Sequence, residues 1–133
     1  MIGICIIDDD LVSQFATRYC IGQFGDDFDI TTHGSAEEAL DFFRDLISDG
    51  AKLPEYIFLD LIMGDMDGWA FIEALEKIWV GTNQPQIYVL SAFANAKDRG
   101  IAKSHQLISG FFDKPLTKSS LEKVFEKRNV GKA

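Results

Sequence analysis

Five short runs of apolar residues recur along the chain, and longer segments of mixed polarity separate them. The runs are residues 4–7, 28–31, 56–59, 87–90 and 110–112, and they are rich in Ile, Val, Tyr and Phe. Each run is too short for a helix and is followed by polar residues, which is typical of a strand. Because the runs are mostly apolar, we expect both faces of their sheet to be covered by helices.

The segments between the runs repeat apolar residues every three or four positions, which is the period of an amphipathic helix. The positions expected to face the core are Val12, Phe15, Ala16, Tyr19 and Cys20, then Ala36, Ala39, Leu40, Phe43 and Ile47, then Phe71, Ile72, Leu75 and Trp79, and finally Leu121, Val124 and Phe125. Residues 94–106 form the weakest predicted helix, because Gly100 interrupts a segment with few apolar side chains.

Three helix starts carry capping signals. Ser35, followed three residues later by Glu38, predicts a capping box before the second helix, and Thr117 is an N-cap candidate for the last. Asp10 immediately precedes the first helical segment and is expected to cap it.

The alternation of strands and helices predicts an α/β fold, because parallel strands need crossovers long enough to hold a helix. The expected architecture is a flavodoxin-like, doubly wound sheet of five parallel strands in the order 2-1-3-4-5. One domain is expected over residues 1–133, since no repeat, low-complexity tract or linker interrupts the pattern. Ligands of such sheets bind at the carboxyl ends of the strands, here between strands one and three.

Charge and composition narrow the possible partners. Thirteen Lys and Arg residues against 21 Asp and Glu residues give a formal net charge of −8. An acidic protein repels phosphate backbones and anionic lipids, so neither direct nucleic-acid binding nor membrane attachment is expected. The N-terminus lacks the basic region of a signal peptide, and polar residues interrupt the longest uncharged segment. We therefore expect a cytoplasmic protein whose two cysteines, Cys5 and Cys20, belong to the core.

Polar residues follow four of the predicted strands. Strand one is followed by Asp8, Asp9 and Asp10, strand three by Asp60, strand four by Ser91 and strand five by Asp113 and Lys114. Carboxylates brought within about 4 Å repel one another by roughly 1–4 kcal/mol per pair, so such a cluster takes up protons or a cation. Carboxylates with a backbone carbonyl and water are the ligands of Mg²⁺, which makes Mg²⁺ the expected cofactor. Helix capping would account for Asp10 alone, but it does not account for a lysine at this edge.

These motifs, taken together, resemble the receiver domain of two-component response regulators. The resemblance rests on residues 6–10, on 58–60 with 63–68, on 90–92 and on 113–115, and it extends over essentially the whole chain. It implies that Asp60 is the phosphoacceptor and that Lys114 and Ser91 contact the phosphoryl group. It also implies that Asp8, Asp9, Asp60 and the main-chain carbonyl of Ile62 bind Mg²⁺. Ala92 and Phe111 match positions of the phosphate-binding loop and of the aromatic switch.

The resemblance implies a signalling function and not that of an enzyme with a separate substrate. Mg²⁺-dependent transfer from a phosphohistidine to Asp60 would change the surface presented to a downstream protein. The expected partners are a histidine kinase or histidine phosphotransfer protein and a target, which in this family binds the face formed by helix four, strand five and helix five. Because the chain leaves no residues for an output domain, we expect a stand-alone receiver.

Two departures from the family pattern bear on the phosphorylated state. Gly64 follows Met63 where the family usually has proline, which removes a rigid φ angle from the loop. The positions two after Asp60 and two after Ser91, which are often polar in members with fast hydrolysis, are Ile62 and Phe93. Neither side chain can orient a water molecule, so we expect a long-lived phosphoaspartate.

Two other interpretations remain open at this point. Asp8 and Asp10 fit the Asp-x-Asp-x-Val signature of haloacid-dehalogenase-like phosphatases, in which the first aspartate is the nucleophile and the second the acid or base. This interpretation leaves Asp60 without a role and the chain without room for a cap domain. The other interpretation is an unphosphorylated interaction module, which is disfavoured because every acceptor-site residue type is present.

Overall fold

The computed structural model describes residues 1–63, 66–79, 81, 84–92 and 96–130, with side chains described as far as Phe125. The strands are β1 (Ile2–Ile7), β2 (Phe28–His33), β3 (Tyr56–Asp60), β4 (Gln86–Ser91) and β5 (Ile108–Asp113). The helices are α1 (Leu11–Phe24), α2 (Ala36–Asp49), α3 (Gly68–Ile78), α4 (Ala96–Ser104) and α5 (Lys118–Val130). All strand pairs are parallel and follow the order β2-β1-β3-β4-β5, which confirms the predicted flavodoxin-like fold.

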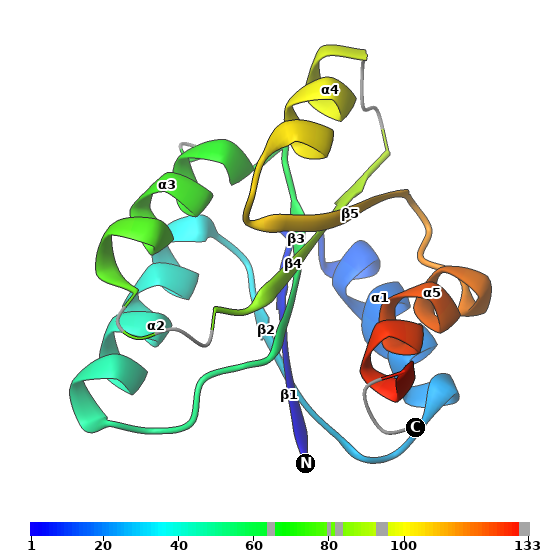
Figure 1. The fold of residues 1–133 in the computed structure, drawn as a ribbon, viewed down its shortest axis with the longest axis horizontal. Helices are drawn as coiled ribbons and strands as arrows, with labels where there is room; N and C mark the ends of the chain where they lie inside the picture. The colour runs from blue at the N-terminus through cyan, green and yellow to red at the C-terminus, as the bar shows by residue number, and fades with distance from the viewer. Residues whose placement is uncertain (64–65, 80, 82–83, 93–95, 131–133) are drawn as a thin grey trace.

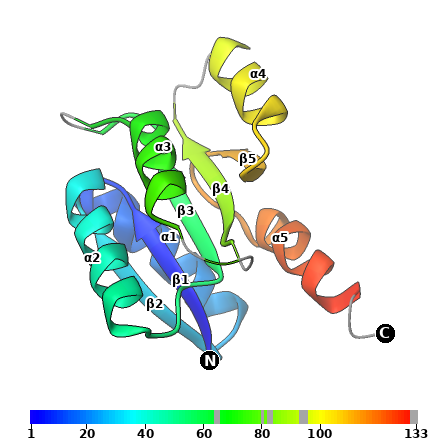
Figure 2. The same ribbon diagram turned by 60° about the vertical axis from the view of Figure 1, so that its left-hand side comes forward.

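Helices cover both faces of this sheet (Figure 1). One core cluster joins alternate residues of β1 and β3, such as Ile7 and Leu59, to Phe43 of α2 and Phe71 of α3. The opposite cluster packs the intervening strand residues against α1 and α5. Helix α4 lies beside β5 at the far end of the sheet, away from α2 (Figure 2).

The three predicted N-caps form, but among the described residues only the Ser35 half of the capping box is found, because the Glu38 carboxylate contacts His33 instead. The Asp10 carboxylate accepts a hydrogen bond from the Val12 amide at 3.0 Å. The Ser35 hydroxyl accepts one from the Glu38 amide at 3.1 Å, and the Thr117 hydroxyl accepts one from the Ser120 amide at 3.1 Å. Each cap satisfies an amide that has no partner within its own helix.

The predicted core face of α1 is wrong except for Cys20, which is half-buried against the core. Val12, Phe15 and Tyr19 are 77%, 70% and 60% exposed, whereas the buried residues of this helix are Thr17 and Ile21. Apolar side chains lie on two sides of α1, so the period of the sequence fits either side. Packing selects the side that carries Ile21, which meets the β1, β3 and α5 side chains of the core.

Helix α4, which the sequence predicted to be the weakest helix, buries one small side chain, that of Ala102. It is also held by polar contacts. The indole Nε1 of Trp69 in α3 donates to Asp98 Oδ1 at 3.3 Å, and the guanidinium of Arg99 pairs with Asp113 at the end of β5. Residues 94 and 95 of the predicted helix lie outside the described residues.

Within the described part of the chain, no helix combines the length and apolar character needed to cross a membrane.

Candidate functional site

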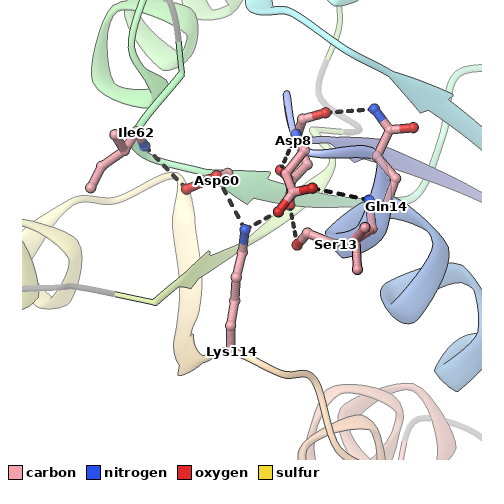
Figure 3. Close-up of polar contacts among 8 residues, drawn as sticks. Asp8, Ser13, Gln14, Asp60, Ile62 and Lys114 are labelled. Atoms are coloured by element: carbon pink, nitrogen blue, oxygen red, sulfur yellow. Dashed lines mark hydrogen bonds and ion pairs between the residues drawn. The ribbon is translucent and has the colours of Figure 1, made fainter.

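The carboxyl ends of β1 and β3 bring two buried carboxylates together (Figure 3). Asp8 follows β1 and is 2% exposed, Asp60 ends β3 and is 8% exposed, and Ser91 ends β4 and is 1% exposed. Lys114 directly follows β5 and extends to the two aspartates. Because β1 and β3 are hydrogen-bonded neighbours, two carboxylates that are 60 − 8 = 52 residues apart in the sequence lie at one edge.

Lys114 bridges the two buried carboxylates. Its Nζ lies 2.7 Å from Asp8 Oδ2 and 3.2 Å from Asp60 Oδ2. Its amide donates to the main-chain oxygen of Ser91 at 3.0 Å, which ties the loop after β5 to the end of β4. Burial lowers the pKa of Lys114, but the hydrogen bond and charge of Asp8 and the charge of Asp60 outweigh this effect and raise it. The ammonium form is therefore strongly favoured.

The Asp60 carboxylate accepts fewer hydrogen bonds than that of Asp8 among the described residues. Its Oδ1 accepts a hydrogen bond from the Ile62 amide at 3.1 Å, and its Oδ2 faces Lys114. Burial raises the pKa of Asp60, the charge of Asp8 raises it further, and the Ile62 amide and Lys114 act in the opposite direction. The net shift is upward, which indicates that the negative charge of Asp60 is incompletely compensated by protein groups.

Asp8 is held by the first turn of α1 through two residues that the sequence analysis missed. The Ser13 hydroxyl donates to Asp8 Oδ2 at 2.5 Å, and Gln14 Nε2 donates to the main-chain oxygen of Asp8 at 2.6 Å (Figure 3). The amide of Asp10 donates to Asp8 Oδ1 at 3.0 Å. The available signal was the position of Ser13 and Gln14 in the first turn of a helix that follows a strand end directly.

The arrangement of carboxylates suits a hard divalent cation. Asp8, Asp9 and Asp60 each offer an oxygen, and these oxygens all lie within 4.8 Å of one another. Asp9 is exposed, whereas the other two carboxylates are buried, so the cluster opens to solvent on one side. Oxygen donors with room for water match the preference of Mg²⁺. The fourth expected ligand, the main-chain carbonyl of Ile62, remains a prediction.

The predicted phosphate-binding residues lie at the carboxyl end of β4, and the predicted switch residue lies within β5. Ser91 is buried at the end of β4, and Ala92 follows it as an exposed residue. Phe111 is half-buried in β5, and the Arg99 guanidinium lies 5.1 Å from the centre of its ring. The same guanidinium pairs with Asp113, so α4 contacts β5 one residue before Lys114.

Of the two residues expected to control hydrolysis, the structure describes Ile62. Phe93, like Gly64, lies outside the described residues. Ile62 is 60% exposed, and Figure 3 shows its side chain directed away from Asp60. Ile62 therefore lies at the mouth of the site and does not cover the acceptor, so its expected effect on hydrolysis depends on its lack of a polar group.

Comparisons with known proteins identify a family and agree with the fold. A family model described as the response regulator receiver domain matches residues 4–126. A two-component response regulator structure from Cytophaga hutchinsonii is 23% identical, with a TM-score of 0.86 and coverage of 94% of each chain. One from Legionella pneumophila is 24% identical, with a TM-score of 0.80 and coverage of 98% of this chain and 99% of that chain. The chemotaxis protein CheY4 of Vibrio cholerae is 18% identical, with a TM-score of 0.71 and coverage of 96% and 98%. A search of curated proteins found no significant match.

Proposed function

Because the chain belongs to the response regulator receiver domain family, we propose that it is a phosphoacceptor in a two-component phosphorelay, with Asp60 as the acceptor. The observation that carries this proposal is the Asp60 carboxylate, buried at the end of β3 and facing the Lys114 ammonium at 3.2 Å. We further propose that residues 1–133 act as one receiver domain.

In the proposed reaction, an oxygen of Asp60 attacks the phosphorus of a phosphohistidine. An O–P bond forms as the N–P bond breaks, and the imidazole nitrogen leaves with the electron pair and takes up a proton. Lys114 lies where its ammonium neutralises negative charge on the transferred group, and the Ile62 amide orients the acceptor carboxylate. Asp8, Asp9 and Asp60 would hold Mg²⁺, which would supply further neutralisation of charge on the transferred group.

The hydrogen bonds also favour Asp60 over Asp8 as the nucleophile. The carboxylate oxygens of Asp8 accept bonds from Lys114, Ser13 and the Asp10 amide, which lowers their nucleophilicity. The phosphatase interpretation also needs Asp10 as an acid or base, but its carboxylate caps α1. The receiver interpretation gives each of these groups a role.

We propose that the phosphodonor binds an exposed apolar row on α1. This row consists of Leu11, Val12, Phe15 and Tyr19, and the rings of Phe15 and Tyr19 stack with centroids 6.3 Å apart. Neighbouring apolar residues exposed along one helix are typical of a protein-binding surface. The row begins three residues after Asp8, so a helix bearing the donor histidine can lie on α1 beside the acceptor.

The proposed target surface lies at the other end of the sheet. A cavity of about 340 Å³ between α4 and β5 is lined by Arg99, Lys103, Ile108 and Phe111, among others. Its cationic and apolar walls suit an acidic segment with an apolar side chain. Arg99 contacts both Phe111 and Asp113, so a displacement of Lys114 toward a phosphoryl group reaches this surface through the adjacent residue.

Labelling with acetyl phosphate and MgCl₂, followed by peptide mass spectrometry, tests the acceptor assignment. We expect one phosphoryl adduct, on Asp60, and none on the Asp60→Asn variant, because an amide keeps the shape but is not a nucleophile. An adduct on Asp8 would support the phosphatase interpretation. A folded wild-type protein that takes up no label under these conditions would support the interaction module.

The donor surface is tested with a histidine kinase or phosphotransfer protein that labels the wild type. Phe15→Ser should slow labelling by that protein while leaving labelling by acetyl phosphate unchanged, since only the former needs the α1 surface. Ile101, which is also exposed but lies in α4, provides the control variant Ile101→Ser. Equal slowing with both donors would show that Phe15→Ser damages the acceptor site itself.

A further inference from the structure

Asp8 is fixed at both its main chain and its side chain by α1. Ser13 and Gln14 occupy the first turn of this helix, and one contacts the carboxylate of Asp8 while the other contacts its carbonyl. The Ser13 bond, at 2.5 Å, is the shortest of the three to the carboxylate. The sequence separations of five and six residues make this a local clamp, set by the start of one helix.

The contacts divide the two carboxylate oxygens of Asp8 into different roles. A carboxylate offers about four lone-pair positions, two on each oxygen. Asp8 Oδ2 accepts from both Ser13 and Lys114, so both of its positions are used. Asp8 Oδ1 accepts from the Asp10 amide, and among the described residues no second donor to it is found. The carboxylate is thereby prevented from rotating, and one position on Oδ1 remains for a cation or its water.

We propose that Ser13 is a positioning residue for the divalent cation, assisted by Gln14, and that its hydroxyl sets the Mg²⁺ affinity of the site. This inference rests on the proposed function, in which Asp8 takes part in Mg²⁺ binding. Ser13 acts through Asp8, because its hydroxyl hydrogen bond fixes the plane of the carboxylate. Partners of this kind, which orient a ligand without touching the metal, typically contribute 10–100-fold to metal affinity.

Removal of the Ser13 hydroxyl has two opposing effects on the Mg²⁺ affinity of the site. A hydroxyl donor withdraws negative charge from Oδ2, so its removal makes the carboxylate a stronger ligand. After that removal the Asp10 amide still holds Oδ1 and Lys114 still holds Oδ2, but a long lysine side chain alone fixes Oδ2 less firmly than lysine and the short Ser13 side chain do together. The loss of orientation is therefore expected to outweigh the gain in ligand strength, and removal of the hydroxyl should weaken binding.

Calorimetric titration of the full chain with MgCl₂ tests the proposal. We expect Ser13→Ala to raise the dissociation constant about tenfold, and Ser13→Thr, which keeps the hydroxyl, to restore most of the affinity. Ser104→Ala is the matched control, because it removes a hydroxyl that donates to two main-chain carbonyls of α4. In acetyl phosphate labelling, Ser13→Ala should shift the half-saturating Mg²⁺ concentration while the rate at saturating Mg²⁺ stays close to that of the wild type.

The outcomes separate this inference from the proposed function. If the wild type is labelled on Asp60 and binds Mg²⁺, but folded Ser13→Ala binds it equally or more tightly, the positioning role is wrong and the proposed function stands. If the wild type binds no Mg²⁺, both fail. A loss of the maximal labelling rate with no shift in Mg²⁺ dependence would also contradict the inference. Should Ser13→Ala not fold, Gln14→Met removes the amide at similar length, and unchanged Mg²⁺ affinity in this variant would overturn the proposal.

Discussion

At the scale of single residues, stability and function favour different protonation states of Asp60. Its burial favours the neutral acid, whereas nucleophilic attack needs the carboxylate. The folded pKa of Asp60 lies above its ordinary value of 3.8, so its contribution to stability is fully present below that value. The contribution is lost as pH rises through the folded pKa. The metal-free protein at neutral pH therefore holds a charge that its fold does not fully compensate.

Asp60→Asn should consequently stabilise the metal-free protein at pH 7. The neutral amide removes the buried charge, and its oxygen can still accept the Ile62 amide hydrogen bond. Urea unfolding with EDTA should give a higher midpoint for the variant at pH 7, and the difference should shrink as pH falls toward 3.8. A lower midpoint at pH 7 would show that the attraction between Asp60 and Lys114 outweighs the cost of burial.

The side chain at position 62 is expected to influence the lifetime of the phosphorylated state. Ile62 cannot orient water and is exposed at the mouth of the site, so Ile62→Asn can introduce a polar group without disturbing the core. We expect the variant to lose its phosphoryl group several-fold faster, as the contribution of one positioned polar group. Decay of purified phosphoprotein in excess Mg²⁺ measures this, with Ile62→Leu as the apolar control. Equal decay rates of all three proteins would show that the side chain at position 62 does not influence hydrolysis.

The residue scale also shows why only part of the site could be predicted. Asp8, Asp60 and Lys114 end or follow strands, and the topology of a parallel sheet brings such residues to one edge regardless of packing details. Ser13 reaches Asp8 only because α1 has a particular rotation relative to β1. That rotation depends on which side of the helix is buried, and the sequence pattern predicted the wrong side.

At the scale of elements, the two helices α1 and α2 differ in how well sequence determines their orientation. In α2 the apolar positions lie on one side, and Ala36, Ala39, Leu40 and Phe43 are buried as predicted. In α1 apolar residues occupy two sides, so periodicity alone is ambiguous. The buried side of α1 is determined by tertiary partners, such as Phe125 of α5, whose ring contacts Phe24 at a centroid distance of 5.2 Å.

The start of α3 depends on a glycine that lets two backbones approach. A Cβ on Gly68 would lie 2.8 Å from the Cα of Leu61 and 2.9 Å from the main-chain oxygen of Asp60. The Gly68 amide also donates to the main-chain oxygen of Leu61 at 2.9 Å, so α3 is attached directly to the loop after the acceptor. Neither backbone atom can move aside without displacing the acceptor loop.

Gly68→Ala should therefore destabilise the protein by about 1–3 kcal/mol, the usual range for overpacking. Gly22→Ala is a suitable control, because a Cβ at this position of α1 meets nothing within 4 Å and alanine favours the helix. Urea unfolding of both variants checks the expectation. A wild-type midpoint for Gly68→Ala would indicate that the loop after β3 can shift without cost.

At the scale of the whole molecule, an acidic protein concentrates negative charge at one edge of its sheet. The formal net charge is −8, and the cluster of Asp8, Asp9 and Asp60 faces only one close cation, Lys114, among the described residues. A ligand that binds the folded state alone stabilises that state by mass action. Mg²⁺ binding at this edge should therefore be visible as stability of the entire fold.

Raising Mg²⁺ to ten times its dissociation constant should add about 1.4 kcal/mol to the free energy of unfolding. Asp9→Ala should abolish most of this gain, because it removes a proposed ligand, and its side chain is exposed and not part of the core. In EDTA the same variant should be at least as stable as the wild type, since it relieves carboxylate repulsion. Thermal unfolding with and without MgCl₂ measures both effects.

General screening by salt must be separated from specific binding in this experiment. Asp26→Ala removes the same charge from an exposed position between α1 and β2, remote in the fold from the carboxyl edge of the sheet. Because the Debye length is about 10 Å at 0.1 M ionic strength, a diffuse effect of Mg²⁺ on an acidic surface should be similar in the two variants. A specific site predicts that Asp26→Ala keeps the stabilisation by Mg²⁺ and Asp9→Ala loses it. If both variants respond to Mg²⁺ as the wild type does, the cation acts on the net charge of the molecule and the carboxylate cluster is not its binding site.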